Sequence, residues 1–155
     1  MPKDTIYNEK YGSVPPFEFN SKVVDVFDDM ISRSVPLYND GLRRMAQLAE
    51  VFYRENTLIY DLGCSNGNFG LTFLSAMGRK PFHMIGVDNS APMLHMYKER
   101  LDKRPHGENV RLVCGRMEDI GLKNASVIVM NLALQFIPLA HRDGMIQSVW
   151  DALVP

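Results

Sequence analysis

Residues 59–70 read IYDLGCSNGNFG, a short apolar run that includes one acid and is followed by three glycines. An apolar run of this length is typical of a buried strand, and glycines directly after it let the backbone turn sharply and approach a ligand closely. Asp61, Gly63, Ser65 and Gly67 form the frame D-x-G-x-S-x-G. The stretch therefore predicts a strand, a ligand-binding turn and the start of a helix.

The composition of this turn indicates which ligand approaches it. A phosphate-binding loop carries a lysine after its last glycine, and none follows here. A dinucleotide fingerprint has a glycine at the position of Ser65, whose side chain obstructs a pyrophosphate. Asp61 favours a cationic amino-acid group over a phosphate. The alternative, a tight turn that binds nothing, stays open at this point.

Strand-like and helix-like segments alternate along the rest of the chain. Strands are predicted over 58–62, 84–87, 110–114 and 125–132. Helices are predicted over 67–77, from Ser90 to a point before Pro105, and over 139–153, the last with Ile146, Val149 and Leu153 on its inner side. Such alternation predicts an α/β fold in which a parallel sheet carries helices on both faces.

The N-terminal third has a different pattern. Residues 1–18 contain Gly12, Pro15 and Pro16 without periodicity and predict an irregular arm. A helix capped by Asn20 or Ser21 and ended by Pro36 follows, and Asn39 or Asp40 can cap a second helix. The second helix is predicted to bury a stripe of four side chains, Leu42, Met45, Ala49 and Phe52. Residues 19–56 are thus a helical cap before a core of residues 57–155, within a single domain 1–155.

The last residues, DALVP, directly follow a predicted helix, where another strand is expected. The strand over 125–132 would then be a bare, apolar edge, which native sheets avoid. Either a partner chain covers this edge, or the chain is the front part of a larger protein whose C-terminal strands are missing here. We favour the second interpretation.

Bulk properties narrow the class of protein. The chain has 155 residues, 46% hydrophobic and 23% charged, which suits one globular domain. Its formal net charge of −1, without a basic stripe, argues against direct binding of nucleic acid. Two cysteines, no secretory leader and no long apolar run indicate a reduced cytoplasmic protein without a membrane span. The histidines 83, 95, 106 and 141 lack ligand spacing, so no metal is predicted.

Further candidate residues follow the other strands. Asp88 ends the second strand, where an acid can accept hydrogen bonds from ribose hydroxyls, and Ser90 suits the capping role better than Asp88 does. Met117 can offer an apolar face to a base, whereas Asp119 is expected to be a solvated turn residue. For Asn131, ligand contact and a structural backbone hydrogen bond are equally supported. Cys64 and Cys114 are expected to lie beyond disulfide reach, as packing or backbone-contact residues.

Four stretches together resemble the carboxy-S-adenosylmethionine synthase family. They are VVDVFDDMISRSVPLY (23–38), YDLGCSNG (60–67), VDNSAPM (87–93) and NASVIVMNLALQF (124–136). The resemblance covers nearly the whole chain after residue 17, and FDDMISRSVPLY is its most specific part because generic methyltransferases lack that block. It implies the Rossmann-like fold of class I S-adenosylmethionine-dependent methyltransferases.

The resemblance also implies an activity. Members of that family are transferases that convert S-adenosylmethionine and prephenate to carboxy-S-adenosylmethionine and phenylpyruvate. A partner enzyme then uses the product for the 5-oxyacetyl modification of the tRNA wobble uridine. The resemblance accordingly implies a cytoplasmic homodimer that binds a small-molecule substrate and holds no tRNA itself. S-Adenosylmethionine is the expected cofactor, with carboxy-S-adenosylmethionine or S-adenosylhomocysteine as other bound forms.

Residue by residue, the resemblance implies contacts with the cofactor but assigns no catalytic residue. Tyr38 would close over its amino-acid portion, and Asn131 would lie beside the sulfonium. At the methionine end, the contacts would come from Asp61, Gly63, Cys64 and Ser65. Asp88 and Asn89 would contact the ribose and the adenine edge, and Arg116 and Met117 would flank the adenine. Arg116 departs from the acid usual in the family, so Glu118 or a backbone carbonyl would have to replace it. The arginine that recognises the transferred carboxylate would lie beyond residue 155.

Two other functions stay open from the sequence. One is an ordinary S-adenosylmethionine-dependent methyltransferase that kept a related cap. The other is a non-catalytic module that binds S-adenosylmethionine.

Overall fold

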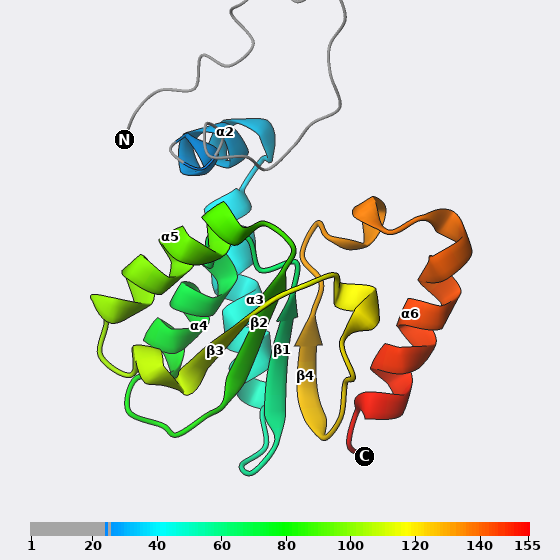
Figure 1. Cartoon of the computed structure of the whole chain (residues 1–155). Helices are drawn as coiled ribbons and strands as arrows, with labels where there is room; N and C mark the ends of the chain where they lie inside the picture. The colour runs from blue at the N-terminus through cyan, green and yellow to red at the C-terminus, as the bar shows by residue number, and fades with distance from the viewer. Residues whose placement is uncertain (1–23, 25) are drawn as a thin grey trace, which may run out of the picture.

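Four parallel strands form the centre of the described structure, as the alternating pattern predicts (Figure 1). The structure is a computed structural model and describes residue 24 and residues 26–155. The strands are β1 (Leu58–Leu62), β2 (Met84–Asp88), β3 (Val110–Cys114) and β4 (Ala125–Val129). Their order is β3-β2-β1-β4. The chain builds outward from β1 to β3 and returns to the other side of β1, so the strand order switches between β1 and β4, where such sheets bind ligands.

Helices cover both faces of this sheet (Figure 1). They are α2 (Phe27–Ser34), α3 (Tyr38–Phe52), α4 (Asn68–Met77), α5 (Ala91–Asp102) and α6 (Leu139–Ala152). Single turns of 3₁₀ helix lie at η2 (Gly107–Asn109), η3 (Met117–Asp119) and η4 (Leu134–Phe136). The predicted arrangement of a parallel sheet between helices is confirmed.

Alternation along β1 places its side chains in two apolar clusters, one on each face of the sheet. Ile59 packs among side chains of α3, α4 and α5, whereas Tyr60 and Leu62 point to the opposite face and join Met145 of α6. Successive strand residues point to opposite faces, so one five-residue strand serves both clusters. β1 is therefore held from both sides, and the turn that follows it has a rigid base.

Three details of the helices differ from the sequence predictions. α3 begins at Tyr38 rather than after Asn39 or Asp40, because Leu37 takes a left-handed conformation (φ 57°) as its N-cap residue, with no side-chain cap. Phe52 is 64% exposed, since the buried stripe passes from Leu42 through Ala46 and Ala49 and misses it. In α6 the buried residues are Met145 and Ala152, and the predicted Ile146 and Leu153 are exposed. Helical spacing predicted where these helices lie, but the predicted inward-facing side was wrong for Phe52, Ile146 and Leu153.

β4 is shorter than predicted. It ends at Val129, and Leu132 takes a left-handed backbone conformation (φ 55°) that turns the chain out of the sheet toward η4. On the outer side of β4, the Val154 N–H donates to the Ala125 carbonyl (2.8 Å), and Leu153 forms a parallel bridge with Ala125. The chain therefore returns beside β4 after α6.

The expected irregular arm 1–18 and the expected caps Asn20 and Ser21 lie outside the described residues. α2 ends at Ser34, ahead of Pro36, as predicted. In the described chain, no helix has both the length and the apolar character required to cross a bilayer.

The ring of Tyr97, on α5, determines how closely the turn after β1 packs on the core. Tyr97 is completely buried. A Cβ atom at Gly67 would lie 2.0 Å from this ring, and one at Gly70 would lie 1.8 Å from its hydroxyl oxygen. Gly67 also has a left-handed φ of 87°, which side chains disfavour. Contact with α5 thus accounts for the glycines at positions 67 and 70, in addition to the ligand approach that the sequence predicts.

We expect Gly67→Ala to lower the free energy of unfolding by about 3 kcal/mol, because it adds a clash with a buried ring to an unfavourable φ. Urea denaturation of the purified chain measures the effect. Gly41→Ala on α3 is the matched control, since nothing lies within 4 Å of its added methyl. This control should be stabilised by about 0.5–1 kcal/mol. Equal stability of Gly67→Ala and wild type would contradict the packing argument.

Candidate functional site

A cavity of about 830 Å³ opens at the carboxyl ends of the four strands, at the switch in strand order. Its walls come from the turns after these strands, from η3 and η4, and from α2. The lining includes all ten residues that the sequence predicts as cofactor contacts: Tyr38, Asp61, Gly63, Cys64, Ser65, Asp88, Asn89, Arg116, Met117 and Asn131. The structure thus brings these residues together around one space, and their contact with a cofactor stays a prediction.

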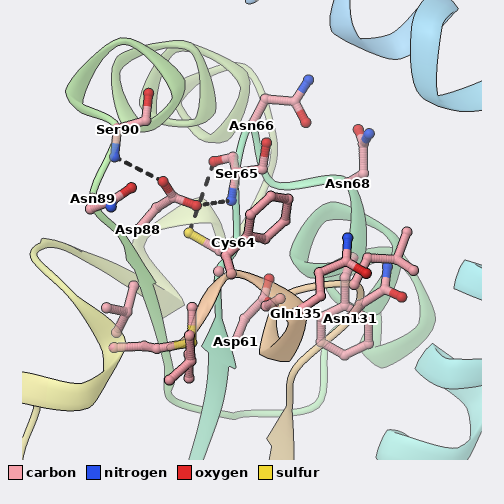
Figure 2. A pocket seen from close by; sticks show the side chains of 18 of the residues that line it. Asp61, Cys64, Ser65, Asn66, Asn68, Asp88, Asn89, Ser90, Asn131 and Gln135 are labelled. Atoms are coloured by element: carbon pink, nitrogen blue, oxygen red, sulfur yellow. Dashed lines mark hydrogen bonds between the residues drawn. The ribbon is translucent and has the colours of Figure 1, made fainter. Parts of the chain in front are cut away.

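Asp88 joins two of the turns that form the cavity (Figure 2). Its Oδ2 accepts a hydrogen bond from the Ser65 N–H (2.8 Å), and its Oδ1 accepts one from the Ser90 N–H (2.8 Å). The Ser90 Oγ accepts from the Met93 N–H (3.4 Å), which confirms Ser90 as the cap of α5. A carboxylate oxygen can accept more than one hydrogen bond, so Asp88 keeps acceptor capacity toward the cavity.

Asp61 is the most deeply buried acid of the site. Its side chain is 2% exposed, and its Oδ2 has no hydrogen-bond partner in the described part of the chain. Burial, and secondly the charge of Asp88, raises the pKa of the Asp61 carboxyl to about 7. A buried charge without a partner is costly, so this acid would gain from a cationic group in the cavity. The Oγ of Ser65 is also buried and without a partner among the described residues.

Cys64 is a packing residue rather than a nucleophile. Burial raises the pKa of its thiol well above the usual range, and the nearby acids Asp61 and Asp88 add to the effect. The thiol therefore stays protonated, and a thiol without its thiolate form reacts poorly. Cys64 and Cys114 are both free, in agreement with the expected separation.

An ion pair lies at the side of the cavity next to η3. The Arg116 Nη2 donates to the Glu118 Oε1 (2.7 Å), and this hydrogen bond is the main cause of the lowered pKa of Glu118. Arg116 is the more exposed partner, with 53% of its side chain accessible against 17% for Glu118. Asp119 is exposed, as expected for a turn residue. An ionised Glu118 thus lines the cavity beside the arginine that the sequence places at position 116.

Asn131 follows the end of β4 and lines the cavity, half-buried. Its side chain makes no hydrogen bond to the described residues, so the structure gives no support to the purely structural interpretation. Its carboxamide is available to a ligand.

Several lining residues were not predicted. Asn66 and Asn68 flank Gly67, Gln135 lies in η4, and Phe27 and Met30 come from α2. Figure 2 shows Asn68, Asn131 and Gln135 on one side of the cavity. Asparagines beside the glycine turn could have signalled Asn66 and Asn68, whereas the apolar residues of α2 resemble ordinary core positions in sequence. The described residues contain no group of three or more His, Cys, Asp or Glu that could hold a metal ion.

Residues 59–155 match the family described as methyltransferase domain. The chain belongs to this methyltransferase-domain family. Among curated proteins, it is 50% identical over its whole length to the carboxy-S-adenosyl-L-methionine synthase of Desulforapulum autotrophicum and 37% identical over 99% of its length to that of Shewanella piezotolerans. It spans 63% of the length of each of these relatives.

Solved structures agree on the fold. A protein of Methanococcus maripaludis described as an S-adenosyl-L-methionine-dependent methyltransferase matches 91% of this chain and 62% of its own, with a TM-score of 0.69 and 17% identity. The amino pentose methyltransferase CalS10 of Micromonospora echinaspora, solved with S-adenosylmethionine bound, matches 92% of this chain and 56% of its own, with a TM-score of 0.60 and 21% identity. The Rossmann-like class I methyltransferase fold expected from the sequence is confirmed.

The raised pKa of Asp61 predicts a pH-dependent stability in this methyltransferase domain. Between the ordinary pKa of 3.8 and about 7, the folded chain holds a proton at Asp61 that the unfolded chain releases. The contribution of this proton to the free energy of unfolding is therefore complete below about pH 4 and is lost as the pH rises toward 7. Relative to Asp61→Asn, wild type should lose on the order of 4 kcal/mol across this interval, because each pKa unit corresponds to about 1.4 kcal/mol.

Urea denaturation of both proteins at intervals from pH 4 to 8 measures this difference. Asp143→Asn, at an exposed position of α6, is the control and should follow wild type at every pH. A constant difference between Asp61→Asn and wild type across the range would contradict a raised pKa.

Proposed function

We propose that this chain binds S-adenosylmethionine in the cavity and acts as the cofactor-binding part of a carboxy-S-adenosylmethionine synthase. The observation that carries the proposal is the 50% identity to a curated synthase of that name along the entire chain. The match covers the whole chain, so the aligned region includes α2, α3 and the FDDMISRSVPLY block as well as the sheet.

The polar atoms of the cavity fit the amino-acid end of such a cofactor. Its ammonium group would approach the unpartnered Oδ2 of Asp61, and the buried Ser65 hydroxyl would give the same end a further hydrogen bond. Gly63 and Cys64 would offer backbone groups. Burial raises the pKa of the Tyr38 hydroxyl, which keeps it protonated as a hydrogen-bond donor over this end.

The nucleoside end fits the other side of the cavity. Asp88, fixed by two backbone N–H groups, would accept hydrogen bonds from the ribose hydroxyls, with Asn89 beside it. Met117 would pack against the adenine. Glu118 would accept from the adenine amino group in place of the acid usual at position 116, and Arg116 would orient it through their 2.7 Å hydrogen bond.

When bound, S-adenosylmethionine supplies a methyl group activated by its sulfonium. Asn131 would lie next to that group, and apolar side chains of α2 would limit the access of water. Prephenate would be the second substrate and phenylpyruvate the second product, and the carboxylated cofactor would serve a separate enzyme that modifies tRNA wobble uridine. We expect a cytoplasmic homodimer that does not itself bind nucleic acid, in keeping with the net charge of −1.

An ordinary methyltransferase is the alternative that the match to the methyltransferase-domain family leaves open. A non-catalytic module that binds S-adenosylmethionine is a second alternative. Both would use the same cavity, so only the reaction separates them from the synthase.

Mass spectrometry tests this function on the protein purified together with any sequence that its gene encodes after residue 155. With S-adenosylmethionine and prephenate, we expect carboxy-S-adenosylmethionine and phenylpyruvate in equal amounts. Omission of prephenate is the control and should leave S-adenosylmethionine unchanged. Tight binding of the cofactor without a carboxylated product would contradict the synthase and leave the two alternatives. Absence of any binding in calorimetric titration would contradict all three.

The affinity for S-adenosylhomocysteine should depend on pH through Asp61. The ligand's ammonium pairs with the ionised carboxylate, so affinity should fall about tenfold per unit below the pKa of about 7. Isothermal calorimetry from pH 5.5 to 8 measures this dependence. Asp61→Asn should bind more weakly and with a flat profile. A flat profile in wild type would show that the ammonium does not pair with Asp61.

A further inference from the structure

Four residues from three separate segments form a closed ring of hydrogen bonds at the edge of the cavity. Arg100 of α5 donates from Nη1 to the Asn66 carbonyl (2.9 Å) and to the Asn68 Oδ1 (3.0 Å). Its Nη2 donates to the Asp28 Oδ2 of α2 (3.1 Å). The Nδ2 groups of Asn66 and Asn68 both donate to the Asp28 Oδ1 (2.9 Å each). We call these residues the Asp28–Arg100 ring.

This ring fastens α2 to the glycine turn. Asn66 and Asn68 belong to the turn and to the start of α4, and both line the cavity. α2 contributes Phe27, Met30 and Ile31 to the same lining. The ring therefore joins the base of the cavity to the helix that forms one of its walls.

α2 is also attached to α5 through apolar side chains. It has eight residues, of which only Phe27 is buried; Phe27 packs with Met93 of α5, and the half-buried Met30 and Ile31 of α2 join the same cluster. After α2, the chain enters α3 through Leu37, which is exposed and has a left-handed backbone conformation. Because only one side chain of this short helix is fully buried, the charge-assisted hydrogen bonds of the ring add to its apolar packing in holding it against the glycine turn.

We propose that the Asp28–Arg100 ring is a latch that holds α2 closed over the bound ligand, and that its opening controls ligand release. Asp28 and Arg100 are positioning residues in this scheme, since they act through Asn66, Asn68 and α2. Their side chains are 23% and 29% exposed, so water can solvate both charges when the ring opens. Opening of α2 would break these charged hydrogen bonds together with the apolar contact between Phe27 and Met93.

The scheme requires reciprocal coupling between the ligand and α2. A ligand that orders the glycine turn also orders Asn66 and Asn68, which strengthens their hydrogen bonds to Asp28. By linkage, a closed α2 must then bind the ligand more tightly. The inference rests on the proposed function only for the choice of S-adenosylhomocysteine as the probe.

Hydrogen exchange tests the closure without any ligand. Amides of residues 27–34 should exchange faster in Arg100→Met and in Asp28→Asn than in wild type. Lys98→Met is the matched control, because it removes an exposed ion pair with Asp102 on the same helix and should not change this exchange. Exchange in Arg100→Met as slow as in wild type would overturn the latch, whether or not the protein binds S-adenosylhomocysteine.

Stopped-flow measurement of S-adenosylhomocysteine release tests the control of the ligand. Loss of charge-assisted hydrogen bonds should accelerate release at least about tenfold in Arg100→Met and Asp28→Asn. The double variant should be little faster than either single one, because both break the same ring. Arg100→Lys, which keeps the charge but not the planar fork, should be intermediate and guards against a misfolded Arg100→Met.

Two outcomes separate a latch from a ring that only stabilises the fold. Faster exchange of residues 27–34 with unchanged release would overturn control by the ring and show that it is purely structural. Failure of wild type to bind S-adenosylhomocysteine would overturn the proposed function instead, and the exchange experiment would still decide whether the ring holds α2.

Discussion

Close contact between the Tyr97 ring and the glycine turn is the constraint on which the site depends. The ring fills the space that side chains at positions 67 and 70 would need, so α4 and α5 can approach each other only over glycines. This contact places the start of α4, and with it Asn68, at the edge of the cavity. Packing against Tyr97 therefore determines the conformation of the turn after β1 on its core side, and the opposite side lines the cavity and is available to a ligand.

The two acids at the centre of the cavity have different surroundings. Asp88 is fixed by the N–H groups of Ser65 and Ser90, and so it joins the turns after β1 and β2 into one surface. Asp61 is more deeply buried, and one of its oxygens has no partner in the described chain. One carboxylate thus organises the site, and the other is an unsatisfied acceptor that a cationic ligand would complete.

Much of this arrangement could be predicted from the sequence because it follows from local rules. The strand ends, the glycine turn and the Ser90 cap are set by residues close in the chain, and parallel strands bring their carboxyl ends to one edge. The Asp28–Arg100 ring could not be predicted, because it joins residues up to 72 positions apart through side-chain geometry. The rotation of α6 was also wrong for Ile146, since three or four neighbouring apolar positions offer more than one plausible stripe.

The charges around the cavity limit how a second substrate could be recognised. Among the described lining residues, Arg116 is the one cation, and it is paired with Glu118. Asp61 and Asp88 face the same space, so the described walls favour a cationic ligand and oppose a carboxylate. In the proposed synthase reaction, the negative charge of the second substrate's carboxylate would have to be neutralised by the sulfonium of the cofactor or by a cation outside these walls. Asn68, Asn131 and Gln135 can orient such a group through their carboxamides, which donate hydrogen bonds without adding charge. In the proposed reaction, the acidic part of the cavity would hold the cofactor, and the part lined by these carboxamides would present no charge to the incoming group.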